Sequence, residues 1–288
     1  MKRLCSILAI ILVATAAQAK EYALSTPNST IILSAEEGKP SLFRYYGSRI
    51  DTKEALALGR ALEHEAYPAF GTDCIRPFAA LVKQHDGDNA MCLVTENVEE
   101  SEANGIKRLS ICMRDKANPT LLVKVHYQAY SDCDIVKINA EYINEGKKPV
   151  VLQKYISAAL PIQSDNCVLL HLDGSDKNEC NEHIVPLTNG VHTISSQTGS
   201  KVARYNNASF MLGLDGRLDE ANCPVIAGTL VWTGNFHFEF HNTYASKAPT
   251  LFMGGINPTA SDYTLAGKSS LTTPEMVFTY TNDGKGGS

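Results

Sequence analysis

Apolar and polar residues alternate with a period of two along much of the chain. Clear examples are 121–127 (Leu-Leu-Val-Lys-Val-His-Tyr), 135–143 and 236–240 (Phe-His-Phe-Glu-Phe). Successive side chains of a β-strand point to opposite faces, so this pattern predicts strands with one buried and one solvated face. Further strands are predicted at 30–35, 41–46, 150–156, 228–232, 251–253 and 275–280.

Turn residues separate these short strands, as in Glu36-Glu37-Gly38 and Asn144-Glu145-Gly146-Lys147. Many short, alternating strands at close spacing are typical of a large antiparallel two-sheet β-sandwich, so the predicted fold class is all-β. One short helix is predicted near 51–61, with Asp51 as its N-cap and with Gly59 weakening it. No sequence repeat, low-complexity tract or internal linker interrupts the predicted domain, which spans 20–280.

The N-terminus carries the pattern of a secretory leader. Lys2 and Arg3 precede an apolar stretch over 4–16, and Ala17-Gln18-Ala19 provides small residues for cleavage. This pattern predicts cleavage after Ala19 and export to the periplasm or the exterior. The apolar stretch is shorter than the roughly 20 residues of a membrane span, and no later segment comes close to that length.

The net charge limits the kinds of binding partner, and the cysteine count bears on the disulfide state. The formal charge of −5 becomes −7 without Lys2 and Arg3, and no basic cluster remains, which argues against binding to nucleic acid or anionic membranes. Without Cys5, the chain retains seven cysteines, an odd number scattered singly. A chain of this size needs no disulfide framework, so buried free thiols are favoured, and the disulfide state stays open.

Motifs for nucleophilic or metal chemistry are missing from the sequence. There is no Gly-x-Ser-x-Gly elbow and no phosphate-binding loop. Cys180, His183 and His192 lack the second ligand pair of a zinc site. The oxygen-rich run 173–179 favours a solvated turn over a calcium loop. No catalytic residue, metal or cofactor is therefore predicted.

Histidines and carboxylates also suggest a solvated surface. His237 and His241 share one face of a predicted strand, but they are too far apart to chelate a metal, so surface positions are predicted. Glycoside cleavage with retention needs two carboxyl groups about 5–5.5 Å apart across a cleft, and no local pattern provides such a pair. Acidic pairs such as Asp132/Asp134 and Asp219/Glu220 are common on any acidic surface.

Trp232 is the only tryptophan, and it could either stack on a sugar ring or lie in the core. It ends a predicted strand just before Gly234 and Asn235, which suit a tight turn. We therefore expect a core position, where truncation to alanine would cost a few kcal/mol. The polar, glycine-rich run 281–288 predicts the start of a linker.

Six blocks resemble, in order and spacing, the N-terminal β domain of glycoside hydrolase family 36 α-galactosidases. The resemblance covers nearly all of the expected mature chain. The blocks are Phe43-Arg44-Tyr45-Tyr46-Gly47, Glu65 to Gly71 followed by Arg76, Ile194 to Ser200, Gly228 to Phe236, Gly254 to Pro258, and Leu271 to Glu275.

The resemblance implies a sandwich of the supersandwich type, packed against a following (β/α)8 barrel. In that family the two catalytic aspartates of a retaining glycosidase lie on barrel strands, and barrel active sites form at the C-terminal ends of strands. The chain is expected to stop before such a barrel, so no residue of the sequence inherits a catalytic role.

The resemblance also implies contacts to the substrate pocket and to the barrel. Asp176 aligns where the family has a pocket tryptophan, and Asp51 lies in the loop, here shortened, where the family has a pocket aspartate. Both are therefore substrate-binding candidates. Arg76 keeps its place in the family pattern, although Asp73 and Pro77 each fall one position early. Arg76, Trp232 and Asn235 are the domain-interface candidates, and the guanidinium of Arg76 suits a bidentate contact to a carboxylate.

Three functions remain open at this point. The first is a non-catalytic domain of an exported α-galactosidase-like enzyme, whose partners would be the barrel, an α-galactoside oligosaccharide or polysaccharide, and further copies of itself. The second is a stand-alone carbohydrate-binding or cell-surface sandwich without hydrolase activity. The third is a purely structural assembly module.

Overall fold

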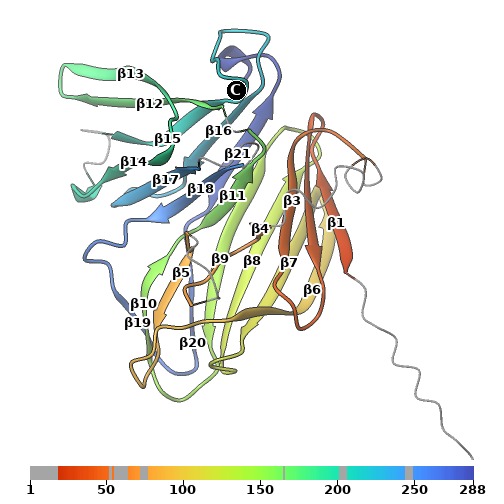
Figure 1. Cartoon of the computed structure of the whole chain (residues 1–288), viewed down its shortest axis with the longest axis vertical. Helices are drawn as coiled ribbons and strands as arrows, with labels where there is room; N and C mark the ends of the chain where they lie inside the picture. Colours follow the sequence, from red (N-terminus) through yellow and green to blue (C-terminus); the bar gives the residue numbers. More distant parts are fainter. Residues whose placement is uncertain are drawn as a thin grey trace, which may run out of the picture.

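The structure is a computed structural model that describes residues 19–51, 54, 64–71, 77–164, 166–200, 206–243 and 249–288 (Figure 1). The predicted leader falls on residues that are not described, apart from Ala19. Strands run from Lys20 to Thr281, and every ladder between them is antiparallel. The predicted all-β class is therefore confirmed. Among the described residues, no helix has the length and apolar character needed to cross a membrane.

One layer of the sandwich is a ten-stranded sheet. Its path runs β13-β12-β15-β16-β21-β9-β8-β7-β6, and β20 pairs with β9 beside this path. The strands are β6 (Leu93–Ala103), β7 (Ile106–Asp115), β8 (Leu121–Tyr130), β9 (Val136–Asn144), β12 (Val168–Ser175), β13 (Asn178–Pro186), β15 (Asn206–Gly213), β16 (Val225–Leu230), β20 (Ser269–Thr272) and β21 (Met276–Thr281).

Three smaller sheets form the second layer. The first is β1 (Lys20–Ser25), β2 (Ser29–Ala35), β3 (Leu42–Ser48) and β4 (His64–Glu65). The second is β19 (Tyr263–Leu265), β10 (Val150–Tyr155) and β5 (Ala80–Lys83). The third is β11 (Ala158–Ile162), β18 (Thr250–Ile256), β17 (Phe236–Asn242) and β14 (Gly190–Ser196).

Aromatic side chains join the two layers. Phe252 on β18 packs against Phe210 and Phe278 of the large sheet, at ring-centroid distances of 4.8 and 5.7 Å. Gly228 on β16 makes room for this contact, because a Cβ there would lie 2.6 Å from the Phe210 ring. Tyr46 on β3 meets Phe278 at 6.5 Å, so the same core continues under the first small sheet. The alternation of the sequence therefore places its aromatic residues between the layers.

Buried tyrosine hydroxyls differ in how well they are satisfied. Tyr67 donates to the carbonyl oxygen of Ile156 at 2.6 Å, and its hydroxyl lies 2.8 Å from that of Tyr142. The hydroxyl of Tyr127 is also buried but has no hydrogen-bond partner among the described residues. Burial raises the pKa of both Tyr67 and Tyr127 well above the ordinary tyrosine value, so both stay protonated.

Phenylalanine substitution tests this difference. Tyr67→Phe removes two buried hydrogen bonds and is expected to lower the free energy of unfolding by about 1–3 kcal/mol. Tyr127→Phe removes an unsatisfied polar group and is expected to leave stability within about 0.5 kcal/mol or to raise it. Urea unfolding of both variants measures the contrast, and a larger loss for Tyr127→Phe would contradict this view of the core.

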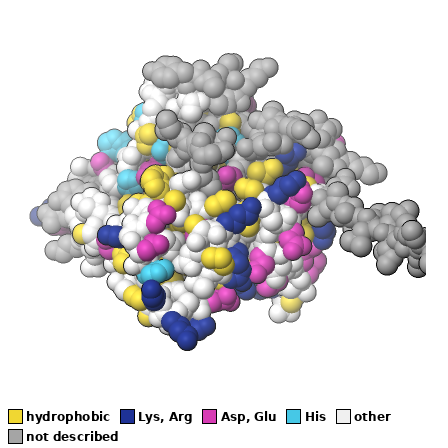
Figure 2. Space-filling view, turned by 60° about the horizontal axis from the view of Figure 1, so that its bottom comes forward, with side chains coloured by type: hydrophobic (Ala, Val, Ile, Leu, Met, Phe, Trp, Pro, Cys, Tyr) yellow, Lys and Arg dark blue, Asp and Glu magenta, His cyan; other side chains and the backbone are white. Residues whose placement is uncertain are grey.

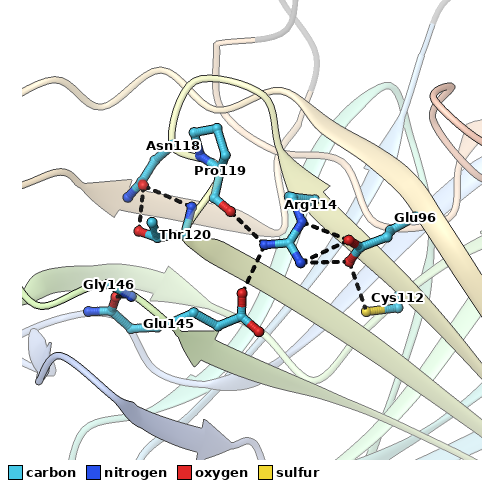
Figure 3. A network of polar contacts seen from close by, with 9 residues as sticks. Glu96, Cys112, Arg114, Asn118, Pro119, Thr120, Glu145 and Gly146 are labelled. Atoms are coloured by element: carbon cyan, nitrogen blue, oxygen red, sulfur yellow. Dashed lines mark hydrogen bonds and ion pairs between the residues drawn. The ribbon is translucent and has the colours of Figure 1, made fainter.

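On β6 to β9, charged side chains occupy the face of the sheet that points away from the core between the two layers. The Arg114 guanidinium binds both carboxylate oxygens of Glu96 at 2.9 Å and the Glu145 carboxylate at 3.0 Å, and it also donates to the carbonyl of Pro119 (Figure 3). These ion pairs of Arg114 are typical of the solvated face of an antiparallel sheet. At the end of the molecule that Figure 2 brings forward, acidic and basic side chains are also interspersed.

The structure describes two residues of the predicted helix and all of the predicted linker start. The predicted helix near 51–61 lies outside the described residues except for Asp51 and Glu54. These two form a reciprocal capping box: Asp51 Oδ1 accepts the Glu54 N–H at 2.7 Å, and Glu54 Oε2 accepts the Asp51 N–H at 3.1 Å. The predicted linker start, 281–288, lies against the 219–223 loop, with three N–H groups at 284–286 donating to its carbonyls at 3.0 Å.

Cysteines are free thiols wherever the structure describes them. Cys112, Cys167 and Cys223 are buried, whereas Cys180 is exposed. The favoured prediction was of buried thiols, and it holds for three of the six described cysteines, because Cys92 and Cys133 are half-buried and Cys180 is exposed.

Candidate functional site

Three of the six sequence blocks meet at one end of the third small sheet. The Asn235 side-chain oxygen accepts the N–H of Gly199 at 2.7 Å, and the Asn235 carbonyl accepts the N–H of Asn257 at 3.1 Å. The Asn257 amide in turn donates to the carbonyls of Ser196 and Phe236 at 3.2 and 3.3 Å. Asn235 and Asn257 therefore hold the segments 194–200, 232–236 and 254–258 together, a role that sequence spacing alone could not show.

Trp232 lies on the surface of this loop cluster, so the prediction of a core position is wrong. Its side chain is 42% exposed, and that of the neighbouring Val231 is 57% exposed. The strand β16 ends at Leu230, and the Trp232 N–H bonds back to the Leu230 carbonyl at 2.8 Å, so the chain turns before Trp232 can enter the core. The indole packs over Gly234, where a Cβ would lie 2.5 Å from its nitrogen.

The other predicted site residues lie on separate elements. Asp51 is exposed after β3 and is engaged by Glu54. Asp176 is exposed at the tip of the β12–β13 hairpin, which projects from the body of the protein (Figure 1). Arg76 lies outside the described residues. The described part of the chain therefore places Asp51, Asp176 and Trp232 on three different loops.

His237 and His241, which were predicted to take surface positions, belong to a half-buried cluster around Glu239. His237 Nε2 and His241 Nε2 each lie 2.8 Å from a different oxygen of the Glu239 carboxylate. Lys154, which comes from β10, donates to both oxygens at 3.0 and 3.1 Å. The Glu239 side chain is only 14% exposed, and that of Lys154 is 12% exposed. The His-x-Glu-x-His alternation on β17 was the signal in the sequence, but the lysine is remote in the chain.

The electrostatics of this cluster favour a structural role. Burial alone would raise the pKa of Glu239, but the hydrogen bonds from His237 and His241 and the charge of Lys154 outweigh it and hold that pKa far below the ordinary value. The carboxylate is therefore ionised and fully engaged, which makes it a poor general base.

The weaker metal candidates do not converge. His183 binds Asp173 at 2.9 Å and stacks on His171 at 5.1 Å, while His192 bonds to the backbone of Thr188. Cys180 is thus left without either histidine as a co-ligand. Among the described residues, no group of three histidine, cysteine or acidic side chains is placed to hold a metal ion.

A hollow of about 280 Å³ opens between β12, β15, β16 and β21. Its lining is mostly apolar, with Leu170, Met211, Ala227 and Val277 as typical members, and it includes no aspartate or glutamate. This hollow therefore lacks the two facing carboxyl groups that glycoside cleavage requires.

The strands and their antiparallel pairing define a large β-sandwich domain. The family model described as "Glycosyl hydrolase family 36 N-terminal domain" matches residues 39–266, and the chain belongs to this family. Among curated proteins, it is 24% identical over 220 residues to alpha-galactosidase 1 of Pediococcus pentosaceus, covering 72% of this chain and 30% of that protein. It is 25% identical over 238 residues to alpha-galactosidase AgaA of Geobacillus stearothermophilus, covering 77% of this chain and 32% of that protein.

Solved structures show the same fold. The crystal structure of AgaA from Geobacillus stearothermophilus matches with a TM-score of 0.83 at 21% identity, covering 92% of this chain and 41% of that one. The galactosidase domain of the α-galactosidase–sucrose kinase AgaSK matches with a TM-score of 0.81, again covering 92% of this chain and 41% of that one. The chain spans about a third of the length of the curated relatives, so it corresponds to their N-terminal domain alone.

Proposed function

We propose that this chain is the supporting N-terminal domain of an exported, retaining α-galactosidase-type glycoside hydrolase. It packs on a catalytic barrel, contributes to contacts between subunits and forms part of the wall of the substrate pocket. The observation that carries this proposal is the confinement of the match to the N-terminal domain of proteins roughly three times as long. The hollow without acidic residues agrees with it.

The proposed substrates are α-galactoside oligosaccharides or polysaccharides. Variants of AgaA have been solved in complex with raffinose and with stachyose, which gives the class of sugar for that relative. In this chain, Asp51 and Asp176 remain the candidates for a contact to such a sugar, and Arg76, Trp232 and Asn235 for contacts to the barrel. The exposed position of Trp232 leaves its indole accessible to a neighbouring domain.

Translation of the reading frame beyond Ser288 tests the proposal. We expect a barrel with two essential aspartates, and we expect the longer polypeptide to hydrolyse raffinose. Substitution of either barrel aspartate should abolish turnover, because nucleophile and acid/base are both required. Retention of turnover by such variants, with loss on substituting an acid within this chain, would overturn the assignment.

The second candidate function is a stand-alone carbohydrate-binding protein. The exposed Trp232 beside polar loop residues favours it, because an accessible indole can stack on a sugar face. Calorimetry of the chain alone with raffinose separates the two functions: binding that Trp232→Ala removes supports this second candidate, and no heat of binding supports the first.

Export is proposed from the leader pattern at 1–19. N-terminal sequencing of the protein recovered from the periplasm or medium should begin at Lys20. Recovery in the cytoplasm with the leader intact would contradict this localisation.

A further inference from the structure

The edge strand β14 of the third small sheet has an unusual composition for its position. It pairs with β17 on one side, and no other described strand pairs with it (Figure 1). Its seven residues, Gly-Val-His-Thr-Ile-Ser-Ser, include no lysine, arginine, acidic residue or proline. Val191 is 57% exposed, and Thr193 is also exposed. An open edge with such a sequence is a template for pairing with another strand.

The other edge strands of the described sheets carry the usual protection against such pairing. Charged residues or proline occupy the longer ones: Lys20 and Glu21 in β1, Glu96, Glu99, Glu100 and Glu102 in β6, Pro161 in β11, and Glu179, Glu182 and Pro186 in β13. The remaining edge strands, β4, β5 and β19, have four residues or fewer. Charge, proline and short length all oppose edge-to-edge pairing, so β14 is the edge in the described part of the chain that lacks these devices.

Two hydrogen bonds show which backbone groups of β14 point to the open side. The Ser196 carbonyl accepts the side-chain amide of Asn257, which follows β18 and so lies on the β17 side, at 3.2 Å. The Ser195 carbonyl accepts the side-chain amide of Asn206 on β15, from the other layer, at 3.1 Å. Backbone groups of successive strand residues point to alternate sides. The N–H and C=O of Thr193 therefore point away from β17, as those of Ser195 do.

The strand is complementary to itself around a two-fold axis at Thr193. In an antiparallel pair centred there, Thr193 faces its own copy, and Val191 faces Ser195 of the second copy. The N–H and C=O of each Thr193 then bond to those of the other. Threonine and valine favour strands, and directly opposed threonines form a favourable cross-strand pair.

Charge does not oppose this pairing. Glu239 on β17 is paired with Thr193, so its carboxylate lies one strand from the proposed seam. Lys154 neutralises this carboxylate at 3.0 Å, and His237 and His241 also bind it. The two Glu239 side chains would be three strand spacings apart, about 14 Å, which exceeds the Debye length of about 8 Å at physiological salt.

We propose that β14 pairs with β14 of a second copy of this chain, antiparallel and centred on Thr193, so that the third small sheets of the two copies form one continuous sheet. This inference goes beyond the proposed function, because it needs only this chain and holds with or without a barrel. Each copy has one such edge, so the assembly closes as a two-fold dimer. Edge pairing over about five residues buries far less than the roughly 1,200 Å² of a standard interface, so we expect a dissociation constant of about 10–500 µM.

Cysteine cross-linking tests the register of the pair. The exposed Cys180 is first replaced by serine, and Thr193→Cys and Val191→Cys are compared in that background under mild oxidation. Thr193→Cys should form a disulfide-linked dimer at least about tenfold faster, because directly opposed residues of an antiparallel pair have Cα atoms about 5.5 Å apart, within disulfide range. The two copies of Val191 would be about 14 Å apart along the strand, so Val191→Cys should remain monomeric.

A matched pair of lysine variants tests the strength of the contact. Sedimentation equilibrium of the purified chain measures its dissociation constant. Thr193→Lys should raise this constant at least about tenfold, because it places two like charges directly opposite each other at the seam. Thr264→Lys makes the same change at an exposed position of another edge strand, β19, and should leave the constant unchanged. Both positions are exposed, so equal melting temperatures of the dilute variants are expected.

Three results would overturn the inference. The first is a chain that sediments as a monomer even at about 1 mM, twice the upper bound expected for the dissociation constant. The second is a dimer that Thr193→Lys and Thr264→Lys weaken equally, which would place the contact elsewhere. The third is cross-linking of Val191→Cys as fast as that of Thr193→Cys, which would exclude the two-fold register even if the lysine variant failed to fold.

Discussion

Replacing Phe252 by alanine is expected to lower the free energy of unfolding by about 3–5 kcal/mol, the range for truncating a large buried aromatic residue. Phe252 is fully buried on β18 and touches rings from both layers, with Phe210, Phe240 and Phe278 at 4.8, 5.3 and 5.7 Å. Its removal leaves a cavity at the junction of the two layers. Guanidinium unfolding with an unchanged m-value measures the loss.

Trp232→Ala is the matched control for this prediction. The tryptophan is larger but is 42% exposed on a turn, so its truncation should cost no more than about 1 kcal/mol. A loss as large as that of Phe252→Ala would contradict the surface placement of the indole and restore the core position that the sequence suggested.

Replacing Glu239 by alanine is expected to cost about 3 kcal/mol, because removal of one partner leaves the Lys154 ammonium without its counter-charge at a nearly buried position. Glu239→Gln keeps the shape and should lose less. Glu99→Gln is the control: Glu99 is 58% exposed and lies 3.6 Å from Lys124, so its loss should be within about 0.5 kcal/mol.

The Glu239 effect should depend on pH with a definite sign. The folded pKa of Glu239 lies below its unfolded value, so its stabilisation is fully present above the ordinary glutamate pKa of about 4.3 and declines as the pH falls below it. The stability difference between wild type and Glu239→Gln should therefore shrink by about 1–2 kcal/mol between pH 7 and pH 3. A difference that is constant over this range would rule out the ionised cluster.

The strand pattern of the sequence predicts much of this fold because each half-buried strand must alternate. The run Phe-His-Phe-Glu-Phe on β17 places three phenylalanines inward and the polar residues outward, as expected. The pairing of β9 with β21 could not be predicted, because it joins segments far apart in the chain. Such non-local choices depend on how the layers pack, and local propensity does not contain that information.

The site was less predictable for the same reason. Asn235 fits a turn by its own chemistry, but its bonds to Gly199 and Asn257 arise only when three loops meet. His237 and His241 belong to a cluster because Lys154 arrives from another sheet. Trp232 was misplaced because β16 ends two residues before it, and strand ends are set by neighbouring strands.

The proposed function assigns this chain the role of a scaffold and assigns the bond-breaking chemistry to a barrel. Its most direct test is an assay of the purified 288-residue chain with an aryl α-galactoside. No aryl alcohol should be released above the buffer rate. Turnover that disappears when acidic residues within the chain are changed to their amides would contradict it.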